Sequence, residues 1–183
     1  MANLKEIRIR IGSVSSTMQI TSAMKMVSAA KLKKAQDAIT AMRPYSNKLS
    51  ELMQSFSGAS AGGNKSYTEN RTLNKVLVVV ISSNRGLCGA FNANIAKEAL
   101  VFKSKEKFRD SQIDFLTIGK KINDTLSKTE TIIQNDSDVF EELNYENVGK
   151  IADELMDRFV SNDYDHIEII YNSFKNAATQ IIK

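Results

Sequence analysis

Hydrophobic side chains recur at steps of three and four residues along the first part of the chain, which places them on one face of an α-helix. No glycine or proline interrupts residues 13–43. We therefore expect one helix over about residues 2–56, roughly 80 Å long at 1.5 Å per residue, kinked at Pro44 because proline lacks a backbone N–H. The stripe is typical of a coiled-coil seam. It consists of Leu4, Ile7, Ile11, Val14 and Met18, then Leu32, Ala35, Ile39, Met42, Tyr45 or Ser46, Leu49, Met53 and Phe56.

The stretch between the two parts of this stripe, residues 20–30, carries small or apolar side chains on nearly every face. A helix that is apolar all round is buried on several sides. Two interpretations follow from the pattern: an alanine-rich core helix, or a shaft enclosed by partner subunits.

The periodicity changes after a glycine- and serine-rich stretch. We place a flexible linker at residues 58–73, between a helical domain at residues 1–57 and a second domain at residues 74–183. In the second domain, short β-branched runs alternate with helical patterns, which predicts an α/β domain with an open, mostly parallel sheet. The expected strands are 75–82, 113–118, 131–133 and 166–171; the expected helices run from a cap at Asn92 to about Phe108, over 120–126, and along a face formed by Val148, Ile151, Leu155 and Phe159.

Composition and charge narrow the class of protein. Apolar residues make up 42 % and charged residues 25 % of the chain, as in globular proteins, and no apolar run reaches the ~18 residues of a membrane span. Residues 1–43 hold eight basic and two acidic side chains, whereas the remainder is net negative. This basic segment predicts an acidic partner surface. A mitochondrial presequence is the alternative, but the helical pattern continues without a cleavage site.

The turn at residues 82–92 follows the first strand and precedes a helix, where α/β folds bind phosphates. Its glycines match neither the dinucleotide-binding nor the Walker pattern, so a structural turn or a subunit contact is favoured. The single cysteine and single histidine exclude an intrachain disulfide and a Cys/His zinc site. A catalytic Cys88–His166 pair is disfavoured, and we expect no catalytic, cofactor-binding or metal-binding residues. The lysines at 31–34 lack the interleaved aromatic residues of a nucleic-acid site.

Three stretches of the chain carry a resemblance to a known family. The first is Thr17-x-Gln19-Ile20-Thr21-x-Ala23-Met24-Lys25-Met26-Val27 with its flanks, continued by Arg43-Pro44-Tyr45. The second is Asn84-Arg85-Gly86-Leu87-Cys88-Gly89-x-Phe91-Asn92, and the third is Tyr171-Asn172-x-Phe174. In this order, and over the whole chain, they resemble the gamma subunit of F-type rotary ATP synthases.

The resemblance implies a non-catalytic rotor subunit that couples proton flow to ATP synthesis or hydrolysis by rotation. The implied partners are the alpha and beta subunits of the catalytic head, the epsilon subunit and the c-subunit ring, without nucleic acid and without membrane insertion. The implied location is peripheral, on the cytoplasmic face of a bacterial plasma (inner) membrane rather than the mitochondrial matrix side. The family ends in a second long helix, antiparallel to the first, whose pattern is absent here. Without that helix, we expect residues 1–56 to fray or to pair with a second copy.

Partner-contact residues are expected on the helix and in the turn. Gly86 and Gly89 would let the chain leave the first strand tightly and enter the next helix. Two other classes of protein remain as alternatives to this family: a nucleotide-binding α/β enzyme with a helical arm, and a nucleic-acid binder that uses the basic arm. The expected contact residues are Lys5, Arg8, Met24, Lys25, Val27, Lys31, Lys33, Lys34, Arg85, Gly86, Cys88 and Gly89.

Overall fold

A computed structural model describes residues 3–59, 67 and 71–183. The chain divides into two compact units, Met1–Gly63 and Asn64–Lys183. The linker expected at residues 58–73 falls mostly outside the described residues. At its end, the Arg71 guanidinium lies 4.2 Å from the centre of the Phe159 ring and donates a 2.6 Å hydrogen bond to the Phe159 carbonyl.

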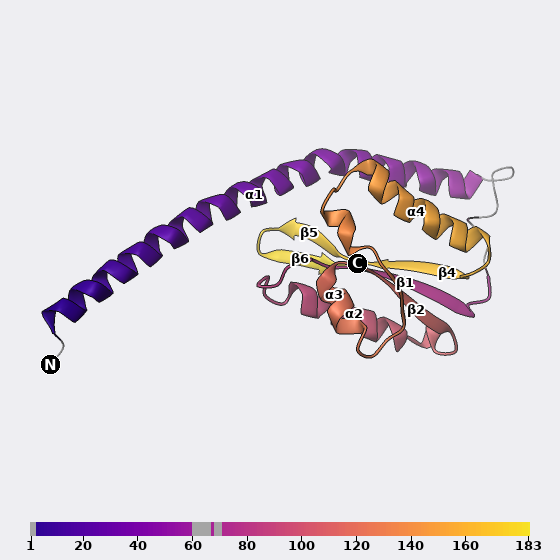
Figure 1. Ribbon diagram of the computed structural model, residues 1–183. Helices are drawn as coiled ribbons and strands as arrows, with labels where there is room; N and C mark the ends of the chain where they lie inside the picture. Colours follow the sequence, from indigo (N-terminus) through magenta and orange to yellow (C-terminus); the bar gives the residue numbers. More distant parts are fainter. Residues whose placement is uncertain (1–2, 60–66, 68–70) are drawn as a thin grey trace. The chain divides into compact units, whose positions relative to one another are not determined.

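The first unit is one continuous helix, α1 (Leu4–Ala59), which confirms the long helix predicted from the heptad pattern (Figure 1). It continues through Pro44 without a break, and Figure 1 shows it as one curved helix. Hydroxyl groups in its first half bond within the helix: Thr17 Oγ1 donates to the Ser13 carbonyl at 2.9 Å, and Thr21 Oγ1 donates to the Thr17 carbonyl at 2.8 Å. These hydroxyls share carbonyls that already accept helical hydrogen bonds, an arrangement that often bends a helix slightly.

The second unit is built on a four-stranded parallel sheet of order β3-β2-β1-β4, which confirms the predicted open parallel sheet. The central strand β1 pairs with β2 from Lys75↔Gln112 to Ile81↔Ile118 and with β4 on its other side. Its run of β-branched residues is buried on both faces, as expected for a central parallel strand. The strands are β1 (Lys75–Ile81), β2 (Gln112–Ile118), β3 (Ile132–Asn135) and β4 (His166–Ile170).

Helices cover both faces of the sheet. Figure 1 shows α2 (Phe91–Lys103) and α3 (Lys120–Leu126) on one face and α4 (Tyr145–Val160) on the other. Alternation along β1 builds the two cores, since successive side chains point to opposite faces. One core contains Val76, Val78, Val80, Ile95, Ala99, Phe102, Phe115, Ile122 and Leu126; the other contains Leu77, Val79, Leu116, Ile118 and Tyr164, with Ile151 and Leu155 packed against it.

Two element boundaries differ from the predictions. The helix expected from a cap at Asn92 to Phe108 begins at Phe91, after Ala90, and ends at Lys103. Asn92 is not its cap, because its side chain is bonded to the preceding loop. Phe108 lies in a separate 3₁₀ turn (Glu106–Phe108) and stacks on Phe102 with ring centres 4.5 Å apart. The expected 131–133 strand lies at Ile132–Asn135, and a further 3₁₀ turn follows at Ser137–Phe140.

An antiparallel hairpin that the sequence analysis did not predict follows β4. It consists of β5 (Asn172–Asn176) and β6 (Thr179–Ile182). Its turn contains neither glycine nor proline, the usual sequence signals of a hairpin. Instead, the Asn176 side-chain oxygen accepts hydrogen bonds from the backbone N–H groups of Ala178 and Thr179, at 3.0 and 2.8 Å.

A buried hydrogen bond joins Tyr164, just before β4, to Asp114 in β2. It makes the stability of the domain sensitive to alkaline pH. The Tyr164 hydroxyl donates to the Asp114 carboxylate at 3.1 Å, and burial raises the pKa of Tyr164 to about 12. A tyrosine in the unfolded chain titrates near 10. Between pH 10 and 12 the unfolded state therefore loses its proton first, and the free energy of unfolding should fall by up to about 3 kcal/mol.

Urea unfolding as a function of pH tests this prediction. Tyr164→Phe should remove most of the loss above pH 10 while lowering stability at pH 7 by about 1–2 kcal/mol, since a buried carboxylate loses a donor. Tyr145→Phe, at a position 94 % exposed, is the matched control and should follow the unmodified chain. Identical alkaline slopes for Tyr164→Phe and the unmodified chain would contradict the assignment.

Candidate functional site

The turn after β1 is closed by its own polar groups. Ser83 Oγ donates to the Arg85 carbonyl at 2.6 Å, and the Ser83 N–H donates to Asn92 Oδ1 at 3.2 Å. Asn92 Nδ2 donates to Cys88 Sγ at 3.2 Å. One asparagine in the first turn of α2 thus holds both ends of the loop, so the loop has a defined conformation before any partner arrives.

The base of the same turn is bonded to the neighbouring strand ends. Asn84 Nδ2 donates to the Ser137 carbonyl at 3.0 Å, and Asn84 Oδ1 accepts from the Lys120 N–H at 2.9 Å. Ser82 Oγ accepts from the Ile122 N–H at 3.0 Å. The contact residues expected from the sequence do not include Ser82, Asn84 or Ser137. Their positions at the carboxyl ends of parallel strands, which converge in α/β folds, were the available signal.

The tip of the turn is exposed. All residues from Arg85 to Ala90 are solvent-accessible, and Leu87 is fully so. Leu87 adopts a left-handed backbone conformation, with φ of 60°. The loop therefore presents an apolar side chain at its apex with Arg85 and Cys88 beside it, and a rigid exposed apolar tip is suited to contact another protein.

The Cys88–His166 pair is not formed. The partners of Cys88 are Ser83, Arg85 and Asn92. His166 opens β4, where Nε2 lies 2.9 Å from Glu168 Oε2 and the ring stacks against Phe108 at 5.7 Å. His166 is therefore a packing residue at the start of β4.

The expected need for glycine holds at one of the two positions. Gly89 has φ of +60°, a conformation that residues with a β-carbon rarely adopt. Gly86 is not among the described glycines with positive φ, and a Cβ there would meet only the end of the Lys121 side chain, at 3.9 Å. The expectation that Gly86 is required for a tight exit from the strand is therefore wrong.

This difference predicts unequal effects of the same substitution. Gly89→Val should lower the free energy of unfolding by about 1–2 kcal/mol, because a β-branched residue is strained in the left-handed region. Gly86→Val should change it by less than about 0.5 kcal/mol, as for other exposed positions. Denaturant unfolding of both variants measures the difference. Equal destabilisation would show that the backbone conformation at Gly89 is not the cause.

The candidate cations of α1 do not form one patch. Each residue along a helix turns by about 100°, so Lys33 and Lys34 point away from the seam, while Lys25 falls on it. Met24 and Val27 are 65 % and 56 % exposed. By the same geometry Met24 flanks the seam, whereas Val27 points away from it on the side of Lys34. The remaining expected helix contacts, Lys5, Arg8 and Lys31, are also exposed. The structure thus distributes the helix candidates around the shaft and gathers the turn candidates in one loop.

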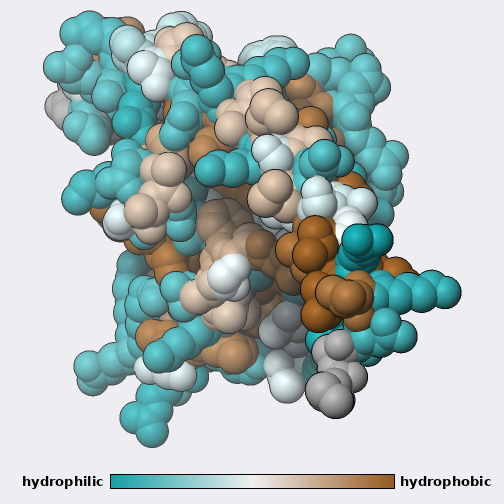
Figure 2. All heavy atoms as spheres, turned by 90° about the vertical axis from the view of Figure 1, so that its left-hand side faces the viewer, coloured by the Kyte–Doolittle hydropathy of each residue, from teal (hydrophilic) through white to brown (hydrophobic). Residues whose placement is uncertain are grey.

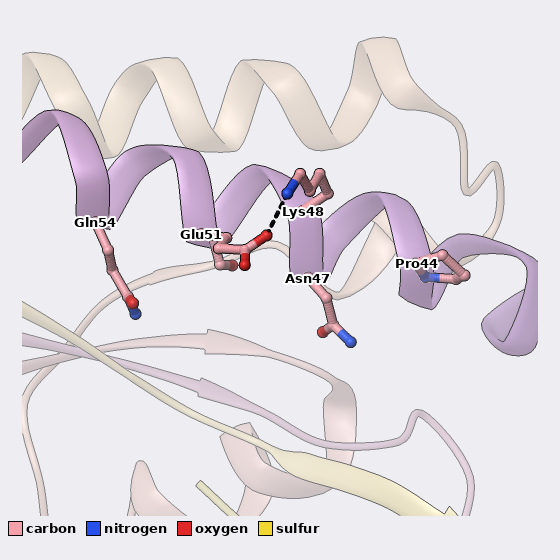
Figure 3. Close-up of a pocket in the computed structure, with 6 residues that line it drawn as sticks. Pro44, Asn47, Lys48, Glu51 and Gln54 are labelled. Atoms are coloured by element: carbon pink, nitrogen blue, oxygen red, sulfur yellow. Dashed lines mark hydrogen bonds and ion pairs between the residues drawn. The ribbon is translucent and has the colours of Figure 1, made fainter.

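Two hollows on the surface are candidate ligand sites. One lies along α1, where Figure 3 shows Asn47 and Gln54 on the same side of the helix and the Lys48–Glu51 ion pair, with an N–O distance of 2.6 Å. The other, with a volume of about 800 Å³, lies between the start of α2 and the β5–β6 hairpin and includes Cys88 and Asn172. The Lys48 and Glu51 side chains of the first hollow are largely exposed, and no Asp, Glu, His, Lys or Arg lines the second.

Within the described ranges, no group of three or more His, Cys, Asp or Glu side chains is placed to hold a metal ion. In the same part of the chain, none of the helices combines the length and apolarity needed to cross a bilayer. Figure 2 shows the surface instead as hydrophilic side chains with apolar ones exposed among them.

Comparison with known proteins relates the chain to one assembly. A family model described as ATP synthase matches residues 3–183. The ATP synthase gamma chains of Flavobacterium psychrophilum and Flavobacterium johnsoniae are 62 % and 59 % identical to it over its full length. The chain spans 64 % of the length of each of these relatives.

Two solved structures share the fold. One is the central stalk and c-ring of the Tetrahymena thermophila mitochondrial ATP synthase, with a TM-score of 0.65 and 25 % identity over 90 % of this chain and 70 % of that one. The rotor of the Euglena gracilis mitochondrial ATP synthase has a TM-score of 0.57 and 20 % identity over 96 % of this chain and 59 % of that one. The two structures therefore show the same fold as this chain.

Proposed function

This chain belongs to the ATP synthase gamma-chain family, and on that premise we propose that it is a non-catalytic part of the central stalk. It would couple proton flow to ATP synthesis or hydrolysis by rotating within the catalytic head. The observation that carries the proposal is α1, a 56-residue helix with large apolar side chains exposed along it. Such a helix is stable only when other proteins or helices cover it.

The proposed partners are the alpha and beta subunits around the helix, and the epsilon subunit and c-subunit ring at the α/β domain. The gamma chains of two Flavobacterium species support placing the assembly at the cytoplasmic face of a bacterial plasma membrane. In this arrangement the nucleotides and the catalytic residues belong to the neighbouring subunits.

The helix suits a rotor because its faces differ. At residues 24–34, the seam side presents Lys25, Ser28 and Leu32, whereas Val27, Lys33 and Lys34 point away from it. A surrounding subunit therefore meets a different chemistry at each angle of rotation. Contacts between charges are long-ranged and weakly directional. Ion pairs between these cations and an acidic surface of a beta subunit can therefore break and re-form at each step.

The turn at Arg85–Gly89 would act as a subunit contact that does not change shape. Its internal hydrogen bonds order the loop in advance, which lowers the entropy lost on binding. The apolar tip at Leu87 would supply buried area, and Arg85 a charge-assisted hydrogen bond.

The role of these cations can be tested in the assembled enzyme. Replacing Lys31, Lys33 and Lys34 together by glutamine should lower ATP-driven proton pumping several-fold, while ATP hydrolysis by the head stays within about twofold. The physical reason is the loss of attraction between the shaft and an acidic lever. Proton pumping by membranes and phosphate release are the two measurements.

Salt dependence and a control variant complete the test. Raising ionic strength screens exposed charges, so the difference between the triple variant and the unmodified enzyme should shrink in high salt. Lys48→Gln, which removes a cation elsewhere on α1, should leave pumping unchanged. Full coupling in the triple variant at low salt would refute this role of the cations.

A further inference from the structure

The two faces of the four-stranded sheet are covered unequally. Among the described residues of the second unit, α2 and α3 pack on one face and α4 alone packs on the other. Parallel sheets are normally buried under helices on both faces. Ile169 of β4 lies opposite Val79 in the register, so its side chain is on the α4 face, and it is 48 % exposed. The β4 end of this face is therefore open.

The hydrogen bonds of α4 show which side of this helix borders the open part of the sheet. Arg158 Nη2 donates to Gln134 Oε1 at 3.0 Å, and Gln134 Nε2 donates to Glu154 Oε2 at 2.9 Å. Gln134 belongs to β3, at one edge of the sheet, so this side of α4 is bonded to β3. The opposite side of α4 is directed toward β4, the strand at the other edge.

That opposite side of α4 is apolar and exposed. At 100° per residue, five residues without a charged group fall within an arc of about 80°. We call them the open flank: Tyr145, Gly149, Ala152, Met156 and Val160. The exposed fraction is 94 % for Tyr145 and 42 % for both Met156 and Val160. Because Ile151 and Leu155 already supply the residues that pack on the core, the apolar arc of α4 is wider than the described part of the domain covers.

Gly149 lies within the open flank and has no packing role among the described residues. A Cβ built on it meets nothing within 4 Å, and its φ is not in the left-handed region. Glycine inside a helix is destabilising relative to alanine, so neither backbone conformation nor a contact in this domain accounts for it. Glycine does permit the close approach of another backbone, which indicates a second element laid along the flank.

Acidic side chains border the open flank on its outer side. Asp153 and Asp157 are exposed and occupy the adjoining arc of the helix together with Glu146. Glu146 pairs with Lys150 at 3.2 Å, whereas Asp153 and Asp157 form no ion pair within the part of the chain that the structure describes. An apolar strip beside two unpaired carboxylates is complementary to an apolar surface that carries cations.

We propose that the open flank and the exposed end of β4 receive a basic helix of a neighbouring subunit. Small or apolar side chains of that helix lie toward Gly149, and its lysine or arginine side chains lie toward Asp153 and Asp157. The helix completes the missing layer on this face of the sheet. A second copy of this chain is disfavoured, since its own flank would bring the same acids together. The proposal rests on the proposed function, because it takes the partner from the same assembly.

Cross-linking in the assembled enzyme identifies the occupant. A photoreactive phenylalanine analogue replaces Ala152, and mass spectrometry of the irradiated complex locates the attached peptide. We expect a helical segment of another subunit, with lysine or arginine within about one turn of the attachment. The same analogue at Leu100, which is exposed on α2, is the matched control and should not reach that segment. Attachment to an acidic segment, to this same chain or to a second copy would overturn the proposal, as would no attachment.

Gly149→Leu separates the contact from folding. Leucine favours a helix more than glycine does, and the added side chain meets no neighbour at its Cβ. The chain alone should therefore unfold at the same or a higher urea concentration. In the assembled enzyme the larger side chain should lower the cross-link yield from position 152 at least about fivefold, because the helix is held away. Lys150→Leu, about 100° further around α4, should leave the yield within about twofold. An unchanged yield in Gly149→Leu would overturn the close approach.

Charge reversal tests the chemistry of the partner. Asp153→Lys combined with Asp157→Lys should lower the cross-link yield at least about 10-fold at low salt, and the difference should shrink as salt screens the charges. Glu106→Lys combined with Asp110→Lys, before β2, is the matched control and should change the yield by less than about twofold. Equal yields in the two double variants would overturn the basic character of the partner.

The outcomes also separate this proposal from the proposed function. Full coupling in an enzyme that gives no cross-link from position 152 would refute the docking surface alone, since α1 carries the rotor role. An enzyme that assembles without retaining the chain would remove the proposed function as well.

Discussion

Replacing Gly119 by alanine is expected to lower the free energy of unfolding by at least about 3 kcal/mol. Gly119 links β2 to α3 with φ of +123°, and a Cβ there would lie 2.6 Å from both the carbonyl oxygen and the hydroxyl oxygen of Ser82. That separation is far below a van der Waals contact, and the atoms it meets include backbone that β1 holds in place. The Gly119 N–H also donates to Ser137 Oγ at 3.1 Å. A shift of the Gly119 backbone would therefore also break this hydrogen bond to the segment that follows β3.

Gly149→Ala is the matched control for this prediction. Gly149 lies within α4, where an added Cβ meets nothing within 4 Å. Alanine has a higher helix propensity than glycine, so this variant should gain up to about 1 kcal/mol. Chemical denaturation of both variants gives the comparison. If Gly119→Ala unfolds at the same denaturant concentration as the unmodified chain, the close approach to Ser82 does not constrain the fold.

Met24→Lys is expected to impair coupling in the assembled ATP synthase far more than folding. Met24 is exposed on α1, so its replacement costs little stability in the chain itself. Beside Lys25 it adds a second cation at one level of the shaft. A new ion pair with an acidic surface of a neighbouring subunit would hold the rotor at one angle and raise the barrier to the next step. Protons pumped per ATP hydrolysed should fall several-fold.

A second variant separates the effect of where the new charge lies from the effect of adding a charge at all. Met26→Lys introduces the same side chain two residues away, about 200° around the helix, and should have a smaller effect. Proton pumping and ATP hydrolysis are measured on the same membranes. An unchanged number of protons per ATP in Met24→Lys would show that this face of α1 does not determine coupling.

Some predictions succeeded because their signals are local. The heptad spacing of α1, the β-branched run of β1 and the pattern over residues 120–126 each lie within one element, and each element forms where its own periodicity indicates. The alternation of strand and helix was enough to predict a parallel sheet, since parallel strands need crossover connections. The turn at residues 84–89 was identified as a candidate site by its place after β1.

The sequence by itself thus determined the long helix with its apolar seam, the sheet and the loop that follows the first strand. Only the tertiary structure decided that Asn92 closes that loop instead of capping α2, that glycine is needed at Gly89 and Gly119 but not at Gly86, and that a hairpin follows β4. The physical reason is the separation along the chain between the groups that interact. Periodicity reports which face of one element is apolar, whereas the contacts of Ser82, Asn84 and Gly119 depend on which atoms distant strand ends bring within hydrogen-bond distance of each other.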